Sequence, residues 1–444
     1  MIIKNKNFDK YFLNKIAFYL FIFSFAFISH VRALNFPDDP EHYTKVFSED
    51  GAWCWFSDPR AVYYEGNHKR TYAGFVTSGG DITVAFYDHL TEEISEVVIY
   101  PELQKDDHVN PSLLILPDGR IMAFFTRHNG GFYYTRTISP EDISKWEEVS
   151  YIDMGPGLCY TNPALLSSEN NRIYVYLRGG YDWKPTFIYS DDLGKTWSDP
   201  ETFVAHAGAT DNDRPYAKIV SDGKSKVWFA ITDGHPRNEP LNSIYVFYYE
   251  NGHFHQVDGT RIGNIGDIPI DQGIINKAYD GTETMVRSWI WDLAIDHNGY
   301  PRIVYTRLLE ETRHQYYYAF WDGSSWEHSF ISLAGQDFPR EERTKEQRNR
   351  EPHYSGGVVL DPQKAGVVYY SRPVNDRYEI FKGVLRDNKW AETPVTTNSE
   401  LDNVRPFVVK NSPLNSSPRL FWMTNRMYQH YSVYDTFLMM KLQQ

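Results

Sequence analysis

A pattern of strand, turn and strand returns along the whole chain, and it constrains the fold more than any other feature. The three clear copies are HVNPSLLILPDGRIMAFF from His108, YTNPALLSSENNRIYVYL from Tyr160 and DRPYAKIVSDGKSKVWFA from Asp213. Looser copies begin near Trp53, Trp289, His353 and Val404. Each copy has a polar or aromatic lead-in, a short apolar run, a turn rich in Gly, Asp, Asn or Pro, and a second run rich in Val, Tyr and Phe. The chain is therefore built from seven similar units, roughly 45 to 75 residues apart.

Repetition of several strands at such a period is typical of a β-propeller, in which each unit forms one blade. We therefore predict an all-β fold, a seven-bladed β-propeller with four-stranded antiparallel blades and almost no helix, over residues 34–444. The 33 Tyr, 27 Phe and 12 Trp suit pleated, half-buried strands. Because a propeller gathers the starts of its innermost strands at its centre, we expect the lead-ins to converge on one central pocket.

Blade boundaries follow from the same repeats. A polar lead-in, residues 34–49, precedes the first four blades, which are predicted at 51–100, 108–149, 160–204 and 211–257. The fifth blade ends near residue 332, and the seventh spans 402–442. Two insertions, 259–287 and the charged segment 338–352, are predicted to be surface loops.

One short motif supports the fold independently. Residues 190–197, SDDLGKTW, match the Asp-box pattern S-x-D-x-G-x-T-W. The Asp and Gly of this motif shape a hairpin turn and the Trp packs beneath it, so its role is structural. The motif occurs in the propellers of sialidases and other sugar-active proteins, and it says little about chemistry.

Residues 1–33 have the pattern of a secretory signal peptide. Several lysines precede an apolar stretch at 16–28, and VRA at 31–33 gives the small residues expected before cleavage. The stretch is short for a transmembrane helix, so we predict a secreted protein, extracellular or periplasmic, with no membrane attachment after cleavage. Export permits a disulfide between Cys54 and Cys159, and the sequence leaves open whether they are bridged.

The formal net charge of -13 argues against broad nucleic-acid binding. It leaves open an acidic sugar bound in a locally basic pocket, because the local field decides such binding.

Polar residues occupy two repeated places, the lead-ins to the inner strands and the ends of the second strands. The lead-ins include Asp58, Arg60, His108, Asn110, Tyr160, Asn162, Arg214, Tyr216, Asp292 and Arg405, and the second-strand ends include His128, Arg178 and His235. A glycosidase needs two carboxyl groups flanking the bond, and Asp58 and Asp292 are the obvious candidates here. His, Tyr and Arg instead suit β-elimination on a uronic acid, where Arg neutralises the carboxylate and His or Tyr move the protons.

Several of these segments carry a family resemblance. WCWFSDPRAVYY, HVNPSLL with FTRHNGG, YTNPALL with YLRGG, and NDRPYAK resemble seven-bladed propellers of the BNR-4 type. In particular they resemble the ulvan lyases of polysaccharide lyase family 25, with family 24 as a relative. The resemblance covers essentially the whole mature chain, and it implies catalytic roles for His108, Tyr160, His128 and Arg178. Tyr174 and Tyr176 are the alternatives to Tyr160, because the later spacings fit loosely.

The predicted function is that of a secreted ulvan lyase, acting as a monomer on an acidic sulfated polysaccharide. The residues predicted to bind substrate are Tyr216, Arg214, Arg60, Asn110, Asn162 and His235. If Tyr160 is the base, Arg178 and the histidines have to lower its pKa. Catalysis requires no cofactor. The resemblance also implies a structural zinc or calcium ion in some members, whose ligands the sequence leaves unassigned; His353, Cys159 and Asp271 are the candidates.

Two other functions remain open at this point. A sialidase-like propeller hydrolase would need an arginine triad for a carboxylate, for which Arg60, Arg214 and Arg405 are available. A non-catalytic sugar-binding propeller would keep the aromatic residues and arginines but would need no pairing of His with Tyr.

Overall fold

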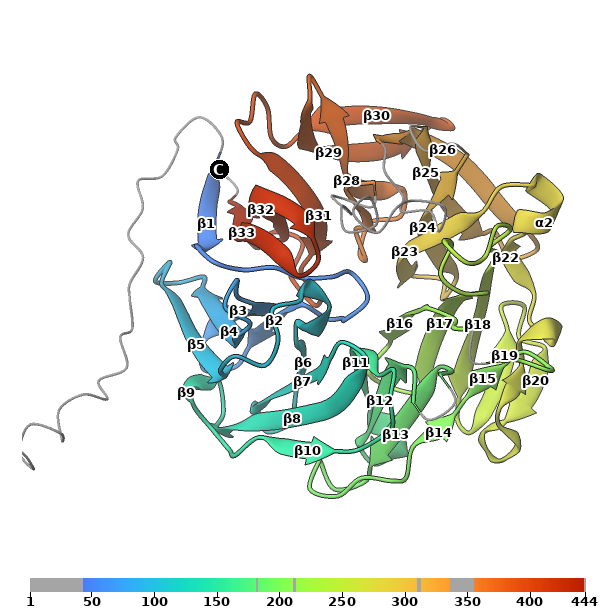
Figure 1. Ribbon diagram of the computed structural model, residues 1–444, viewed down its shortest axis with the longest axis horizontal. Coiled ribbons are helices and arrows are strands. Elements are labelled where there is room, and N and C mark those ends of the chain that lie inside the picture. Colours follow the sequence, from blue (N-terminus) through green and yellow to red (C-terminus); the bar gives the residue numbers. More distant parts are fainter. Residues whose placement is uncertain (1–42, 181–182, 211–212, 310–312, 336–354, 443–444) are drawn as a thin grey trace, which may run out of the picture. The chain divides into compact units, whose positions relative to one another are not determined.

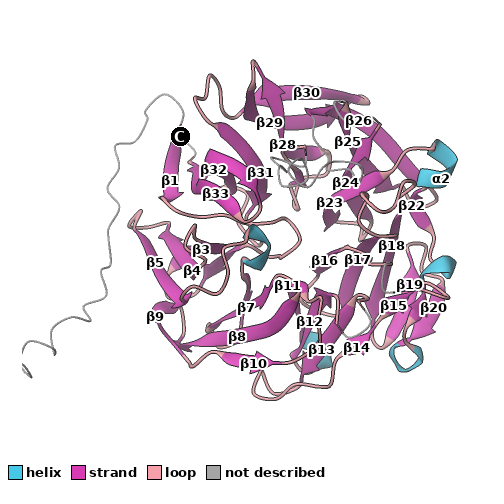
Figure 2. Cartoon of the chain, in the orientation of Figure 1, coloured by secondary structure: helices cyan, strands magenta, loops and turns pink. Residues whose placement is uncertain are grey.

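The structure is a computed structural model that describes residues 43–180, 183–210, 213–309, 313–335 and 355–442. Residues Asn35–Gln444 form one compact unit, and the predicted signal peptide, 1–33, lies outside the described residues. Within the described ranges, seven antiparallel sheets are arranged as the blades of a β-propeller (Figure 1). Helix is limited there to α2 (Gly281–Thr284) and short 3₁₀ turns (Figure 2). The predicted fold is confirmed.

The first three blades follow the predicted order along the chain. Blade one is β2 (Ala61–Glu65), β3 (Lys69–Val76), β4 (Ile82–Asp88) and β5 (Ile94–Tyr100). Blade two is β6 (Ser112–Ile115), β7 (Ile121–Arg127), β8 (Gly130–Ser139) and β10 (Ser150–Ile152), with β9 (Asp142–Trp146) also paired to β8. Blade three is β11 (Cys159–Leu166), β12 (Arg172–Arg178), β13 (Thr186–Ser190) and β14 (Glu201–Thr202).

Blade four is larger than predicted. Its sheet is β16 (Ala217–Ser221), β17 (Lys226–Thr232), β18 (Ile244–Glu250), β19 (His253–Gln256) and β20 (Arg261–Asn264), with β22 (Lys277–Tyr279) paired to β18. A separate short parallel pair is formed by β15 (Val204–Ala205), which precedes this sheet in the sequence, and β21 (Ile270–Asp271), which lies between β20 and β22. The segment 259–287, predicted to be a loop, therefore supplies strands, because its backbone groups find partners along open strand edges.

Blades five and six each have four strands. Blade five is β23 (Ser288–Ile295), β24 (Pro301–Leu308), β25 (His314–Trp321) and β26 (Trp326–Gly335). Blade six is β27 (Val358–Leu360), β28 (Val367–Val374), β29 (Arg377–Arg386) and β30 (Lys389–Pro394). The charged segment 338–352, predicted to be a loop, lies outside the described residues.

Blade seven is completed from both ends of the chain. It contains β31 (Asp402–Val408), β32 (Leu420–His430) and β33 (Val433–Lys441), and its outermost strand is β1 (Thr44–Ser48). β1 pairs antiparallel with β33, with Thr44 opposite Lys441. The sequence predicted only a polar lead-in here, since nothing local shows that this strand pairs with the far end of the chain.

The Asp-box forms the expected turn after β13. The Asp192 carboxylate accepts from the backbone N–H groups of Lys195 and Thr196, at 3.0 and 2.8 Å, and the Ser190 hydroxyl accepts from Gly194 N–H at 2.8 Å. Trp197 then packs edge-on against Phe124 of the neighbouring blade two. The motif thus fixes a hairpin and joins two blades, which is a structural role.

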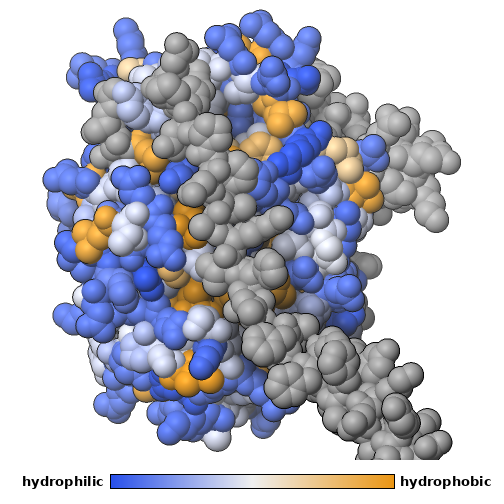
Figure 3. Space-filling model, turned by 90° about the vertical axis from the view of Figure 1, so that its left-hand side faces the viewer, coloured by the Kyte–Doolittle hydropathy of each residue, from blue (hydrophilic) through white to orange (hydrophobic). Residues whose placement is uncertain are grey.

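The outer surface is mixed in character. On the side drawn in Figure 3, hydrophilic side chains cover much of the described surface and hydrophobic ones are scattered between them. Among the described residues, no helix is long and apolar enough to cross a membrane.

Candidate active site

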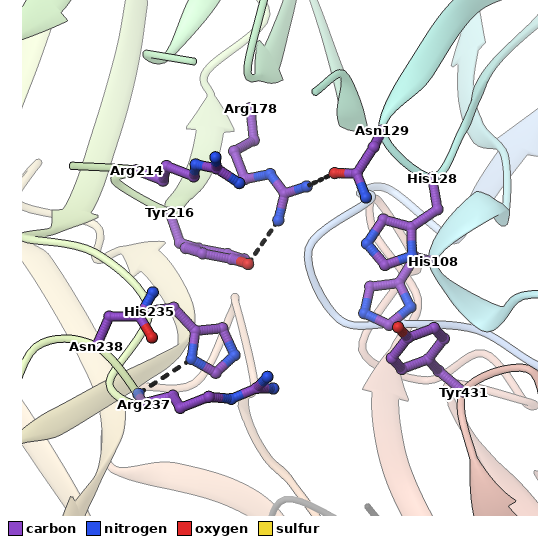
Figure 4. A pocket seen from close by; sticks show the side chains of 10 residues that line it. All are labelled: His108, His128, Asn129, Arg178, Arg214, Tyr216, His235, Arg237, Asn238 and Tyr431. Atoms are coloured by element: carbon purple, nitrogen blue, oxygen red, sulfur yellow. Dashed lines mark hydrogen bonds between the residues drawn. The ribbon is translucent and has the colours of Figure 1, made fainter. Parts of the chain in front are cut away.

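A pocket of about 210 Å³ lies where the lead-ins to the inner strands meet the ends of the second strands. Six of the residues predicted from the sequence line it: His108, His128, Arg178, Arg214, Tyr216 and His235 (Figure 4). The other lining residues are Asn129, Arg237, Asn238 and Tyr431. Side chains scattered over most of the chain thus converge, as the repeats predicted.

One carboxylate holds both histidines of blade two. Asp106 caps the short 3₁₀ helix η1 (Asp107–Val109), and its Oδ1 lies 2.7 Å from Nδ1 of His108. Its Oδ2 lies 2.8 Å from Nδ1 of His128, which follows β7. The two rings stack at 4.3 Å with an interplanar angle of 12°. Because each Nδ1 faces a carboxylate oxygen, each carries a proton there, and Nε2 is the nitrogen left for chemistry.

The stacked imidazoles differ in charge. Burial alone would lower the pKa of His108, but the carboxylates of Asp106 and Asp107 outweigh it and hold that pKa well above its usual value. Burial lowers the pKa of His128, and the positive charge on His108 lowers it further. The two pKa shifts therefore run in opposite directions, which favours the charged ring at His108 and the neutral ring at His128.

Arg178 presents its guanidinium from the end of β12. Its Nη1 donates to the Tyr216 hydroxyl at 2.5 Å, and its Nη2 donates to Oδ1 of Asn129 at 3.0 Å (Figure 4). The group also lies over the rings of Tyr160 and Tyr216, at 5.0 and 4.9 Å from their centroids. Two hydrogen bonds and two aromatic contacts fix the orientation of this cation, which is suited to bind a carboxylate through its planar fork.

Tyr160 is buried in contact with two residues of the pocket, His108 and Tyr216, and is not among the residues that line it. It is 4% exposed, its φ is 62°, and its ring contacts Phe56, His108 and Tyr216. Burial raises the pKa of Tyr160 well above its usual value, and the opposing effect of Arg178 is smaller. A tyrosine that acts as a base at this position needs a lowered pKa. The surroundings of Tyr160 raise its pKa instead.

The two alternative tyrosines of blade three lie in the core between blades. Tyr174 donates to Glu169 at 2.8 Å, and Tyr176 packs edge-on against Phe203 and Phe229. Neither lines the pocket. Of the tyrosines predicted from the sequence, Tyr216 is the one that lines the pocket, where its hydroxyl accepts from Arg178.

Three other residues predicted to bind substrate are buried away from the pocket lining. Asn110 accepts from the backbone N–H of Cys54 at 2.9 Å, and Asn162 donates to the carbonyl of Phe56 at 2.9 Å. Arg60 is 1% exposed and pairs with Asp58 at 3.0 Å. In these positions the side chains hold the inner strands together.

The lining residues that the sequence reasoning missed come from turns. Asn129 directly follows His128 and has a φ of 66°, while Arg237 and Asn238 follow His235 in the turn between β17 and β18. Tyr431 comes from the turn between β32 and β33 and meets His108 edge-on at 4.6 Å. Asn129, Arg237 and Asn238 could have been predicted, because each lies within three residues of a predicted histidine. No such neighbour in the sequence points to Tyr431.

Comparison with known proteins places this architecture in a family. The model of a family described as "BNR repeat-containing family member" matches residues 70–333. The chain belongs to this BNR repeat-containing family. No curated protein sequence matches the chain significantly.

Among solved structures, the BNR-repeat chain is similar to a polysaccharide lyase described as a PL25 ulvan lyase, with a TM-score of 0.66 and 15% identity over 88% of this chain and 94% of that chain. A second structure of that lyase, bound to -[GlcA(1-4)Rha3S]-, matches equally well. Polysaccharide lyase Uly1 matches with a TM-score of 0.56 and 11% identity, over 90% of this chain and 97% of that one. At these identities the likeness shows a shared fold.

The described lining of the pocket lacks the pair of carboxyl groups that most glycosidases use. No Asp or Glu is among its described lining residues. Asp58 is buried and paired with Arg60 and Lys218, and Asp292 accepts from the backbone N–H of Leu360 at 3.0 Å. The two candidate carboxylates are therefore structural.

The three arginines available for a sialidase-like triad do not converge either. Arg60 pairs with Asp58, and Arg405 pairs with the fully buried Asp107 at 2.6 Å. Arg214 alone of the three lines the pocket, where it lies over the Trp183 ring at 3.8 Å.

Two described clusters have donor atoms close enough to suggest a metal, Cys54 with Asp107 and His108, and Asp106 with His108 and His128. In the second, nitrogen and oxygen lie 2.7 and 2.8 Å apart, which is hydrogen-bond distance. Ligands around a zinc ion, each about 2 Å from the metal, stand farther apart than this. In the first, Oδ2 of Asp107 accepts from Arg405 and its Oδ1 lies 3.1 Å from Nδ1 of His108, so the contacts in both clusters are those of ion pairs and hydrogen bonds.

The predicted metal-ligand candidates do not form a described group. His353 lies outside the described residues, Asp271 accepts from the backbone N–H of Gly273, and the Cys159 thiol faces the His108 carbonyl at 3.8 Å. Cys54 and Cys159 are both buried and free, so they are not bridged.

Proposed function

We propose that this protein is a polysaccharide lyase that cleaves ulvan by β-elimination, between a sulfated rhamnose and a uronic acid. The observation that carries the proposal is the composition of the pocket: three arginines, three histidines and two tyrosines, with no carboxylate among the described lining residues. A hydrolase would need the reverse, a pair of carboxyl groups at the bond.

The chemistry begins at the uronate carboxylate. Arg178 binds this group, and the neutralised carboxylate makes the C5 proton acidic. His128 takes that proton through Nε2, because its ring is neutral and its Nδ1 proton is held by Asp106. The electron pair of the broken C5–H bond forms the C4–C5 double bond as the bond from C4 to O4 breaks. His108 then gives its Nε2 proton to O4.

Three features of the comparisons and the sequence support the substrate. A lyase of the same fold is described as bound to -[GlcA(1-4)Rha3S]-, an acidic sulfated disaccharide unit. The arginines of the pocket suit a polyanion although the whole chain is acidic. The signal-like residues 1–33 fit an enzyme that meets such a polymer outside the cell. We propose that the secreted protein acts as a monomer and that catalysis needs no metal.

The direct test is to incubate the mature protein with ulvan and to follow the ultraviolet absorbance of the unsaturated uronyl ends. A lyase produces a steady rise in this absorbance. New reducing ends without absorbance would mean a hydrolase, and binding without either product would mean a sugar-binding module; both outcomes contradict the proposal. Heparin and polygalacturonate, which carry uronates in other backbones, show whether ulvan is the preferred polymer.

A further inference from the structure

His235 forms the wall of the pocket on the side away from His108 and His128 (Figure 4). It follows β17, and its carbonyl accepts from the backbone N–H groups of Asn238 and Glu239, at 2.8 and 3.0 Å, which close a tight turn. Its ring packs against Tyr216 and Trp289, with centroids 5.6 and 4.8 Å away. The turn and the aromatic contacts fix the plane of the imidazole.

The turn also fixes which ring nitrogen of His235 carries the proton. The backbone N–H of Arg237 donates to Nδ1 of His235 at 3.1 Å (Figure 4). An amide N–H needs a lone pair to donate to, so Nδ1 is unprotonated and the neutral ring carries its proton on Nε2. This arrangement is the opposite of that of His108 and His128, whose Nδ1 atoms face Asp106.

The surrounding charges keep this ring neutral. Burial lowers the pKa of His235 well below its usual value, and the positive charges of Arg237, Arg178, His108 and Arg287 lower it further. A ring in this state offers an N–H to the pocket over the whole neutral range and neither gains nor loses a proton there. It resembles a fixed hydrogen-bond donor more than an acid or a base.

The geometry points to a role for His235 that none of the comparisons assigns: we propose that it is a neutral hydrogen-bond donor that, with Arg178, binds the uronate carboxylate and stabilises the negative charge that grows on it during β-elimination. This inference rests on the proposed function. His235 keeps its own proton throughout; the C5 proton goes to His128, and the proton that O4 receives comes from His108. The developing charge is thus met by one cation and one neutral donor placed on the same side as Tyr216.

Two substitutions of His235 separate this role from simple packing. His235→Ala removes the donor and is expected to lower kcat roughly 100-fold, with a much smaller change in KM. His235→Gln places an amide N–H near the position of Nε2 and is expected to recover most of that loss. The ratio of wild-type to variant kcat should stay constant through neutral pH, because the pKa of His235 is held well below its usual value. His255→Ala, in β19 of the same blade, is the matched control and should leave kcat unchanged.

Nitrogen-15 NMR of the imidazole provides a readout that does not depend on activity. We expect Nδ1 of His235 unprotonated, Nε2 protonated, and no titration across the same pH range. A protonated Nδ1, a titration near pH 6 to 7, or a glutamine variant as poor as the alanine variant would each overturn the proposal. If the wild-type protein cleaves no uronate polymer, the proposed function fails instead, while the tautomer measured by NMR still decides whether His235 is the donor described.

Discussion

The two ends of the inner strands show how differently one propeller can use its charges. At one end is the pocket with His108 and Arg178, about 210 Å³ in volume. At the opposite ends of the inner strands is a larger cavity, about 820 Å³, with Asp58 and Lys226 among its lining residues. On volume alone, the second would be the binding site.

The charges separate the two ends. Near the large cavity the buried charges satisfy one another: Asp58 accepts from both Arg60 and Lys218, and Lys218 also donates to the Trp55 carbonyl. In the small pocket the corresponding cation, Arg178, is held by neutral partners, Tyr216 and Asn129, so its charge is available to an anionic ligand. The way a charge is satisfied, more than the size of a cavity, is the basis on which we propose the small pocket as the active site.

The largest effect is expected for Arg178. In the proposed reaction Arg178 stabilises the transition state, so Arg178→Ala should lower turnover on ulvan on the order of 100-fold or more. Arg178→Lys should recover only part of this loss, because Lys lacks the planar fork. The control is Arg172→Ala at the other end of the same strand, where Arg172 pairs with the exposed Asp191. Near-normal turnover of Arg178→Ala would remove the distinction between the two ends.

Asp106→Asn should change the pH profile of kcat/KM and lower its maximum by roughly tenfold. His108 has to be protonated to act, and its pKa is raised, so wild-type activity is lost only as pH rises through that raised value. His128 has to be neutral, and its pKa is lowered, so activity is lost only as pH falls below the usual histidine range. The wild-type profile is therefore a broad plateau around neutrality.

Removing the Asp106 charge lowers the pKa of His108 and brings the alkaline limb of the profile to lower pH. Asp118→Asn, at an exposed turn, should leave the profile where it is. An unchanged alkaline limb in Asp106→Asn would show that this carboxylate does not set the charge of the pair.

A smaller effect is expected for Tyr160, which supports Arg178 from below. Tyr160→Phe keeps the aromatic ring under the guanidinium, so kcat should fall by less than about fivefold. Tyr216→Phe, measured alongside, removes the hydroxyl that meets Arg178 and should lower kcat more. A loss of about 100-fold in Tyr160→Phe would instead make Tyr160 a proton-transfer residue, as the sequence alone predicted.

The smallest kinetic effect is expected for Lys218, which pairs with Asp58 near the larger cavity. Lys218→Met breaks a buried ion pair with Asp58 and should lower the free energy of unfolding by about 3–5 kcal/mol. Urea denaturation measures that loss, and kcat at a temperature where the variant stays folded should equal that of the wild type. A large fall in kcat of the folded variant would show that the residues near the larger cavity also serve the reaction.

The blades and much of the pocket were predictable because their signals are local. Turn residues and alternating strands mark each repeat, and the ends of neighbouring inner strands must meet in a propeller, which is how His108, His128 and Arg178 were found. The direction of a lead-in side chain was not predictable, because a one-residue change of register reverses its face. Arg60 and Asn162 therefore lie in the predicted segments, but their side chains are buried away from the pocket. Tyr160 has a left-handed φ near the start of its strand, which no sequence pattern predicts.

Contacts that depend on distant parts of the chain were missed for a different reason. Asp106 stands beside Asp107 in the sequence, and only the folded geometry shows that the first bridges two histidines while the second neutralises Arg405. Tyr431 reaches the pocket from the last blade, far from any residue that drew attention to it.

The pairing of β1 with β33 ties the timing of folding to the assembly of the pocket. Among the described residues, the ring closes only when β33 has paired with β1, the first described strand. Tyr431, just before β33, accepts through its carbonyl from the backbone N–H of Asp107, next to His108. An incomplete chain therefore holds an open sheet edge in place of a finished pocket, and such edges invite pairing with other chains. A single late step thus removes an aggregation hazard and brings Tyr431 against His108.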